Sequence, residues 1–291
     1  MTLSPPEQFI LLGHPVAHSL SPAMHNAAFA ALEMHRNYAL ADVLTDEFPQ
    51  AMERLRRGEW AGANVTIPHK QRAHQHVDSH DLHATQSGSV NTIIASDGAL
   101  VGHDTDGPGL IHALQVGQDF DARGARCVVL GAGGAANAVV SALATAGART
   151  LTVLARRPEE ARKQPGILRA GADVGILGAM DSWPSEVDLV VHATPVGLGL
   201  SEESDRFAST VAICARWLPR NLPPTTLFVD LIYTPRNTAF LTAAARHGMR
   251  LEDGLGMLVA QAQLAFQLWT GHSAPEGVMQ EAAINLLRAG R

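Results

Sequence analysis

The sequence places two hydroxyl groups beside the expected start of a helix. Ser19 and Ser21 flank Leu20, and Pro22 follows them. A serine followed by a proline is typical of a helix N-terminus, so we predict Ser21 as the N-cap and Pro22 as the first helical residue. Capping accounts for Ser21 but leaves Ser19 without a structural role. Two hydroxyls beside a helix N-terminus are well suited to hold a carboxylate.

Lys70 closes a second polar segment, which begins at Asn64. Pro68 ends the strand expected there, so Lys70 follows the carboxyl end of a strand, where α/β proteins build their sites. The alternative for such a lysine is a solvated surface charge. Asn91 and Asp106 belong to a third polar group, and either of them alone would be ordinary turn chemistry.

A glycine turn lies between a predicted strand and a predicted helix. Residues 127–130 are strand-like, and Gly131-Ala132-Gly133-Gly134-Ala135 opens a helical run that ends before Gly147. A G-x-G-x-x-A pattern in this setting is typical of dinucleotide binding. The glycines leave room for a pyrophosphate beside free N–H groups at the helix N-terminus. The alternative is a tight turn without a ligand, and the strand–turn–helix setting favours the dinucleotide.

Two arginines follow the next predicted strand, residues 151–154, at Arg156 and Arg157. An NAD enzyme usually has Asp or Glu at this point, which accepts a hydrogen bond from the 2′-hydroxyl of the adenosine ribose. This chain has Ala155 there, and guanidinium groups suit a 2′-phosphate. We therefore predict NADP as the cofactor rather than NAD. The alternative is that both arginines only solubilise a loop.

The elements that must position these groups alternate along the chain. Ser96-Asp97-Gly98 indicates a hairpin turn, and the two last helices, 255–269 and 275–289, have no strand between them. Helical patterns or loops separate short apolar runs at 9–12, 63–67, 127–130, 151–154, 174–177, 189–192 and 227–231. The five runs from residue 127 on, the first of which leads into the glycine turn, predict a doubly wound sheet. We expect the two last helices to fold back onto the first domain.

These patterns predict an α/β protein with two α/β domains. The first is a discontinuous N-terminal substrate-binding domain, residues 1–105 plus 254–291. The second is a Rossmann-type NADP-binding domain, residues 106–253.

Composition argues against several classes of protein. Hydrophobic residues make up 46% of the chain and charged residues 17%, which is too apolar for a disordered chain. The net charge of -6 argues against a nucleic-acid partner. Residues 127–148 are uncharged but hold too many glycines and polar residues for a membrane span. With two cysteines and no signal-like N-terminus, we predict a cytoplasmic protein that does not associate with a membrane. We expect a monomer or homodimer, although no sequence pattern points to either.

Taken together, the motifs resemble those of the shikimate/quinate dehydrogenase family. They occur in the family's order and span nearly the whole chain, so their joint agreement is very specific. The motifs are Ser-Leu-Ser-Pro at 19–22, Asn-Val-Thr-Ile-Pro-His-Lys at 64–70, Val-Asn-Thr at 90–92, Asp-Thr-Asp-Gly at 104–107, the Gly131 turn, Ala-Thr-Pro-Val-Gly at 193–197, Asp-Leu-Ile-Tyr at 230–233, and Asp-Gly-Leu-Gly-Met-Leu-Val-Ala-Gln-Ala at 253–262.

The resemblance implies an NADP-dependent oxidoreductase of aromatic amino acid biosynthesis that interconverts 3-dehydroshikimate and shikimate. It implies that Ser19, Ser21 and Tyr233 hold the ring carboxylate. The residues that it assigns to the ring hydroxyls are Asn64, Thr66, Lys70, Asn91, Asp106 and Gln261. It also makes Lys70 and Asp106 the catalytic pair. That assignment fits the chemistry, because reduction of a ketone leaves charge on its oxygen and requires a proton donor.

The resemblance further implies that the nicotinamide lies near Thr194, with Gly254 and Met257 close by, in a cleft between the two α/β domains. Two positions depart from the family's common pattern. Asp104 stands where many members have Asn, and His192 stands where Asn commonly precedes the Ala-Thr segment. These departures leave open an enzyme that prefers quinate or aminoshikimate. A non-catalytic dinucleotide sensor is a further alternative, although a sensor needs no hydride-transfer pair.

Several histidines invite other interpretations. His76, His80 and His83 have the spacing of one helix face, yet the residues around Ser79 indicate a helix break, so we predict no metal site. His69 adjoins Lys70, which leaves a modest role in tuning Lys70 as one alternative, and we predict that His69 is exposed to solvent.

Overall fold

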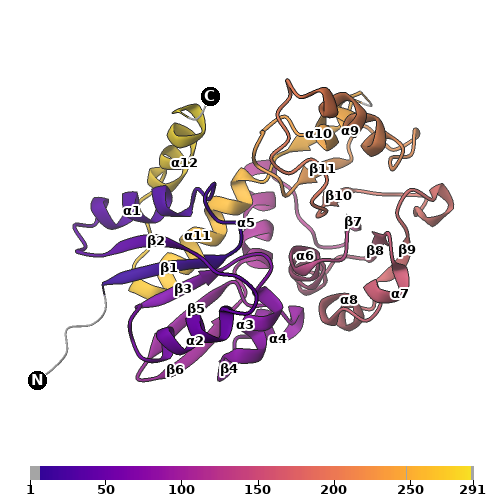
Figure 1. Cartoon of the computed structure of the whole chain (residues 1–291). Coiled ribbons are helices and arrows are strands. Elements are labelled where there is room, and N and C mark those ends of the chain that lie inside the picture. The colour runs from indigo at the N-terminus through magenta and orange to yellow at the C-terminus, as the bar shows by residue number, and fades with distance from the viewer. Residues whose placement is uncertain (1–6, 247, 290–291) are drawn as a thin grey trace, which may run out of the picture. The chain divides into compact units, whose positions relative to one another are not determined.

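The chain folds into two α/β units, each built on a six-stranded sheet (Figure 1). The computed structural model describes residues 7–246 and 248–289. Unit 1 holds the chain up to Thr105 and again from Val259, and unit 2 is Asp106–Leu258. The α/β class expected from the alternating pattern is confirmed. The chain returns to unit 1 at residue 259, inside a helix, rather than at 254.

Unit 1 contains a mixed sheet with strand order β2-β1-β3-β5-β6-β4. From β1 the chain moves to β2 on one side and to β3 on the other, so the carboxyl ends of β1 and β3 border a topological switch point. Its elements are β1 (Gln8–Gly13), α1 (Ser21–Ala31), β2 (Asn37–Asp42), α2 (Phe48–Arg56), β3 (Gly62–Val65), α3 (Lys70–His76), β4 (Ser79–His80), α4 (Leu82–Ser87), β5 (Thr92–Ser96), β6 (Ala99–His103), most of α11 (Leu255–Thr270), and α12 (Val278–Ala289).

Strand β1 runs through the middle of unit 1 and is covered on both faces. Phe9 stacks against Phe29 and Trp269, whereas Ile10 belongs to a cluster with Phe48 on the opposite face. This two-sided burial explains why an uninterrupted apolar run forms a strand here. The predicted hairpin is confirmed, since β5 and β6 pair antiparallel around a turn in which Asp97 and Gly98 both have positive φ.

Unit 2 contains a sheet in which every strand pair is parallel, with order β12-β11-β10-β7-β8-β9. The predicted doubly wound sheet is confirmed, and its order reverses between β7 and β10. The elements are α5 (Asp106–Gln118), β7 (Arg126–Leu130), α6 (Gly134–Thr145), β8 (Thr150–Ala155), α7 (Pro158–Ala161), α8 (Pro165–Ala170), β9 (Asp173–Ile176), a 3-10 turn (Met180–Ser182), β10 (Leu189–His192), α9 (Asp205–Ala215), β11 (Leu227–Asp230), α10 (Ala239–Ala245) and β12 (Arg250–Glu252).

Helices of unit 2 cover both faces of its sheet. On one face Leu110 of α5 and Val139 of α6 pack against Val129 of β7. On the other, Cys214 of α9 and Phe240 of α10 belong to a second cluster with β10 and β11. Such cover is what an all-parallel sheet requires.

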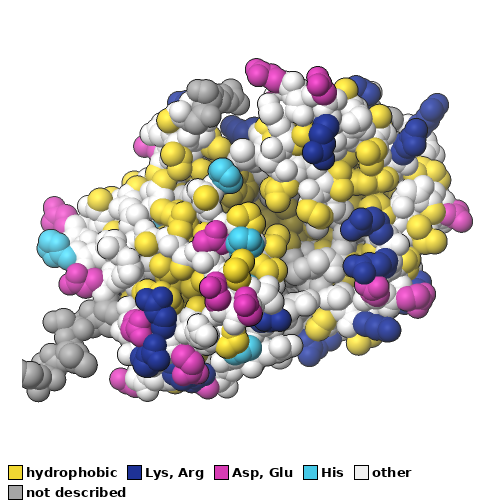
Figure 2. Space-filling model, in the orientation of Figure 1, with side chains coloured by type: hydrophobic (Ala, Val, Ile, Leu, Met, Phe, Trp, Pro, Cys, Tyr) yellow, Lys and Arg dark blue, Asp and Glu magenta, His cyan; other side chains and the backbone are white. Residues whose placement is uncertain are grey.

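No described helix is long and apolar enough to cross a bilayer. The face drawn in Figure 2 shows Lys and Arg side chains dispersed among acidic and uncharged ones rather than gathered into one basic surface.

A buried histidine in unit 1 gives the fold a pH dependence. His25 of α1 is fully buried, stacks on Tyr38 with ring centroids 4.4 Å apart, and has no hydrogen-bond partner on either ring nitrogen within the described residues. Burial lowers the pKa of His25 from 6.5 to about 3. Unfolding frees the imidazole to take up a proton, so stability falls as the pH drops below 6.5.

We expect His25 alone to remove on the order of 2 kcal/mol of unfolding free energy between pH 6.5 and pH 5. In a His25→Leu variant the side chain has a similar volume but no titrating group. The unfolding free energy of this variant should fall by that much less between the same two pH values. Urea unfolding of both proteins at the two pH values measures the difference. Parallel losses in the two proteins would show that His25 is not the cause.

Candidate active site

The carboxyl ends of β1 and β3 come close together in unit 1. A Cβ built on Gly13, the last residue of β1, would lie 2.2 Å from Cγ2 of Thr66, which follows β3. Only glycine permits this approach, because any side chain at position 13 would displace Thr66. Two of the three predicted polar motifs, those of Ser19 and of Asn64, therefore emerge at the same switch point.

The roles of the two serines differ from the sequence prediction. Ser21 is the first residue of α1 and not its N-cap; Leu20 holds the cap position without a side-chain hydrogen bond. Instead, Oγ of Ser19 accepts a hydrogen bond from the backbone N–H of Ser21 at 3.2 Å. The correction has a local cause: Leu20 has already adopted helical φ and ψ, which moves the helix start by one residue. Ser19 is half-buried and Ser21 is buried.

Asn64 lies at the centre of a buried polar network. Its Nδ2 donates to the backbone carbonyl of Asn91 and to Oγ1 of Thr92, both at 3.0 Å. Its Oδ1 accepts from the hydroxyl of Tyr38 at 2.8 Å. In turn, Nδ2 of Asn91 donates to Oγ1 of Thr105 at 2.9 Å. Because every member is bonded to another, the network fixes the side-chain orientations of Asn64 and Asn91.

Sequence reasoning missed Tyr38. Burial raises the pKa of its hydroxyl, which keeps it protonated, and Ser21 shares a side-chain hydrogen bond with it. Tyr38 thereby connects the serine motif of α1 with Asn64 of β3. The only sequence signal was an aromatic residue in β2, a strand that the apolar pattern did not reveal.

Lys70 is the first residue of α3, and the preceding residue, His69, anchors this end of the helix through its side-chain contacts. His69 is fully buried, stacks on Phe48 with centroids 4.5 Å apart, and its Nε2 donates to the carbonyl of Val43 at 2.7 Å. The prediction that His69 is solvent-exposed was wrong, because the ring packs against α2. The carbonyl of Lys70 accepts from the N–H of Val90 at 3.0 Å, so the backbone of Lys70 is fixed on both sides.

The remaining predicted substrate residues lie in both units. Gln261 is buried in α11, within unit 1. Asp106 is the first residue of α5 in unit 2 and is buried. The next residue, Gly107, allows α5 to approach α6 closely, because a Cβ on Gly107 would lie 2.8 Å from Cβ of Ala142. Tyr233 is half-buried after β11, and burial raises the pKa of its hydroxyl. It is therefore a neutral hydrogen-bond donor.

The glycine turn has the geometry of an anion-binding helix start. Gly131 has φ of 116°, and a Cβ on it would lie 2.7 Å from the carbonyl oxygen of Ala193, so both its conformation and its surroundings require glycine. Gly133 is the N-cap of α6, makes no side-chain cap bond and has open space around its Cα. The N–H groups of the first turn of α6 thus face an open position that suits a pyrophosphate. Ala132, Gly134 and Ala135 complete this segment.

The two arginines after β8 differ in their contacts. Arg157 forms an ion pair with Glu160 at 2.9 Å, whereas Arg156, also exposed, has no hydrogen bond or ion pair within the described chain. Arg156 is therefore the better candidate to receive a phosphate.

Three further predicted cofactor residues lie at the carboxyl side of the unit 2 sheet. Thr194 follows β10 and is half-buried. Gly254 directly precedes α11. A Cβ on Gly254 would lie 2.2 Å from the carbonyl oxygen of Leu231, so this position must be glycine. Met257 belongs to the hydrophobic core of unit 2 and is 8% exposed, so little of its side chain is available to a ligand.

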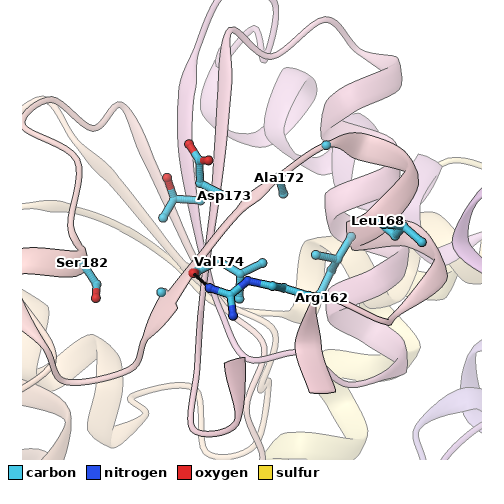
Figure 3. Close-up of a pocket in the computed structure, with 10 residues that line it drawn as sticks. Arg162, Leu168, Ala172, Asp173, Val174 and Ser182 are labelled. Atoms are coloured by element: carbon cyan, nitrogen blue, oxygen red, sulfur yellow. Dashed lines mark hydrogen bonds between the residues drawn. The ribbon is translucent and has the colours of Figure 1, made fainter. Parts of the chain in front are cut away.

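A surface hollow elsewhere in unit 2 holds none of these residues. Figure 3 shows it beside β9, with Arg162, Asp173, Val174 and Ser182 among its lining. The guanidinium of Arg162 donates to the carbonyl of Val174 at 2.8 Å and is thus already engaged. Among the described residues, no group of three His, Cys, Asp or Glu side chains could hold a metal ion. The helix break predicted near Ser79 is present, since α3 ends at His76.

Comparison with known proteins agrees with this geometry. A family model described as the shikimate dehydrogenase substrate binding domain matches residues 11–93, and one described as the shikimate 5'-dehydrogenase C-terminal domain matches residues 254–284. A shikimate dehydrogenase (NADP(+)) of Desulforamulus reducens is 40% identical over 93% of this chain and 92% of its own. One of Moorella thermoacetica is 41% identical over 92% and 90%.

A solved structure is similar along nearly the whole length. Shikimate 5-dehydrogenase of Thermus thermophilus, in complex with NADP(H) and shikimate, has a TM-score of 0.81 and 36% identity, covering 96% of this chain and 98% of that one. The similarity therefore extends over both units and is not limited to the glycine turn.

Proposed function

This chain belongs to the shikimate dehydrogenase family, and from that premise we propose that it catalyses the reversible NADP-dependent interconversion of 3-dehydroshikimate and shikimate. The observation that carries the proposal is the similarity, over 93% of the chain, to a relative named for that activity. Both units retain the residues that this chemistry requires. The names of these relatives favour shikimate over quinate or aminoshikimate as the substrate, and the pair Lys70 and Asp106 favours an enzyme over a non-catalytic sensor.

The residues of the glycine turn fit the cofactor. The open first turn of α6 suits a pyrophosphate, and the unpaired guanidinium of Arg156 suits the 2′-phosphate that distinguishes NADP from NAD. Gly131, Gly133 and Gly134 would hold the pyrophosphate, with Arg157 as a second basic group. Thr194, Gly254 and Met257 are assigned to the nicotinamide side. When bound, NADP supplies the hydride acceptor for oxidation and the hydride donor for reduction.

The chain's own residues hold the substrate and move the proton. Ser19, Ser21 and Tyr233 are neutral donors suited to the ring carboxylate. Asn64, Thr66, Asn91 and Gln261 are assigned to the ring hydroxyls. In oxidation, Lys70 takes the proton of the reacting hydroxyl as the hydride leaves the same carbon. In reduction, its ammonium returns that proton to the ketone oxygen, and Asp106 accepts a hydrogen bond from the adjacent hydroxyl.

The proposal extends to the surroundings of the enzyme. Cys127 and Cys214 are buried free thiols, as expected in a reducing compartment, which supports a cytoplasmic location. We further propose a monomer or a homodimer.

A panel of two acids and two cofactors tests the proposed function. Purified protein is mixed with shikimate or quinate and with NADP or NAD, and the ultraviolet absorbance of the reduced nicotinamide follows the reaction. We expect the highest kcat/KM for shikimate with NADP. A higher value for quinate would contradict the proposed substrate, and formation of no reduced cofactor with either acid would contradict the proposed activity.

A further inference from the structure

Beside the glycine turn, unit 2 buries a histidine between a carboxylate and a threonine. His192 is the last residue of β10 and is fully buried. Its Nδ1 lies 2.9 Å from Oδ1 of Asp230, at the end of the neighbouring strand β11, and its Nε2 lies 2.5 Å from Oγ1 of Thr194. The residues thus form a continuous chain, Asp230–His192–Thr194, that ends at a half-buried hydroxyl.

The other hydrogen bonds of Asp230 determine which atoms donate and which accept in the series Asp230–His192–Thr194. Asp230 also accepts from the N–H of Ile232 at 3.0 Å and from the hydroxyl of Thr238 at 2.6 Å, so this carboxylate acts only as an acceptor. Nδ1 of His192 must then carry a proton and donate it to Asp230. Phe240 stacks on the imidazole with centroids 4.5 Å apart, and in the neutral imidazole the single ring proton is the one on Nδ1. Nε2 is therefore an acceptor, and the hydroxyl of Thr194 donates to it.

The direction of these hydrogen bonds determines which hydrogen bond the hydroxyl of Thr194 can still make with a ligand. Its proton is directed inward to His192, and its oxygen also accepts the N–H of Val196 at 3.2 Å. A hydroxyl has one proton and two lone pairs, so the one remaining position on Oγ1 can only accept. Toward a ligand, Thr194 offers an acceptor and no donor.

The topology indicates which ligand group meets this acceptor. Cγ2 of Thr194 lies 3.2 Å from the position that a Cβ on Gly131 would occupy, so Thr194 borders the glycine turn. Strands β8 and β10 flank β7 on opposite sides. With the adenosine half directed toward β8 and Arg156, the nicotinamide half is directed toward β10. This step rests on the proposed function.

We propose that His192 is a positioning residue that fixes Thr194 as an acceptor for a hydrogen-bond donor of the nicotinamide nucleoside. Two groups of that nucleoside have this chemistry, namely the carboxamide NH2 and the ribose hydroxyls. The proposal gives a role to one of the two positions at which this chain departs from the family's common pattern.

Each of two substitutions removes one of the two hydrogen bonds of His192 and keeps the other. In His192→Gln the amide reaches the place of Nε2 and can still accept from Thr194, but the donor to Asp230 is lost. In His192→Asn the amide reaches only the place of Nδ1, so the bond to Asp230 is kept and the acceptor for Thr194 is lost. Each variant is compared with the wild type in kcat/KM for NADP and for its 3-acetylpyridine analogue, which has a methyl group in place of the NH2.

We expect His192→Asn to lose about fivefold in kcat/KM for NADP, the effect of one neutral hydrogen bond, and His192→Gln to stay near the wild type. If the carboxamide is the partner, the preference of His192→Asn for NADP over the analogue falls about fivefold. If a ribose hydroxyl is the partner, the asparagine variant loses equally with both cofactors. A purely structural role predicts the opposite order, because glutamine removes the bond to the buried carboxylate.

The proposal is overturned if His192→Asn matches the wild type, or if His192→Gln is the more damaged of the two. Thr194→Val removes the hydroxyl itself while His192 and Asp230 keep their own side chains, and we expect it to lower kcat/KM for NADP about fivefold. Wild-type turnover of shikimate with NADP is measured first. Its absence would contradict the proposed function, whereas its presence with unaffected variants would contradict only the role of His192.

Discussion

A Lys70→Ala enzyme should oxidise shikimate about 10³-fold more slowly than the wild type at saturating substrate. The proton of the reacting hydroxyl has to leave as the hydride departs, and without the amine that proton is released to water alone. NADPH binding should be unchanged, because Lys70 belongs to unit 1 and the proposed cofactor residues precede residue 258, in unit 2. Steady-state kcat and a fluorescence titration with NADPH measure the two quantities.

The chain offers a matched control, since Lys163 is its other lysine and is exposed in unit 2. Lys163→Ala should retain wild-type kcat. Lys70→Arg keeps the positive charge but cannot exchange a proton near neutral pH, so it should remain close to Lys70→Ala. Near-full turnover by Lys70→Ala would remove Lys70 from the proton-transfer step.

The second large effect concerns the choice of cofactor. Arg156→Ala should lower kcat/KM for NADP about 10- to 100-fold, the range for loss of one charge-assisted hydrogen bond to a phosphate. Turnover with NAD, which has no 2′-phosphate, should change little. The measurement is kcat/KM for each cofactor in the wild type and the variant.

Arg157→Ala is the natural comparison for Arg156→Ala. Its guanidinium is already paired with Glu160, so we expect a smaller loss with NADP than at Arg156. Equal losses with NADP and NAD in Arg156→Ala would mean that the arginine does not recognise the 2′-phosphate.

Local patterns were enough to predict the cofactor-side fold. The sequence was enough to predict the strand β7, the turn at Gly131 and the helix α6. Burial on both faces of the strand produces an unbroken apolar run, and the turn needs glycine. Strand β2 was missed. Its residues alternate poorly and include two alanines, which have weak strand propensity, and it is held by pairing with β1.

Side-chain roles that depend on distant partners could not be predicted. His69 looked like a surface residue because nothing next to it in sequence shows that Phe48 covers its ring. The exchange of roles between Ser19 and Ser21 depends on the backbone conformation of Leu20, which composition does not reveal. His192 was recognised only as a departure from a motif. Its bond to Asp230 joins two strands that lie side by side in the sheet but are distant in sequence.

The central claim is that a hydride passes from a ring carbon of shikimate to NADP. The most direct test uses shikimate that carries deuterium on the carbon whose hydroxyl is oxidised, with the NADPH product analysed by mass spectrometry. We predict NADPH that contains one deuterium from the labelled acid, and unlabelled NADPH when ordinary shikimate reacts in deuterated water. Unlabelled NADPH from the labelled acid, or no NADPH at all, would contradict the account.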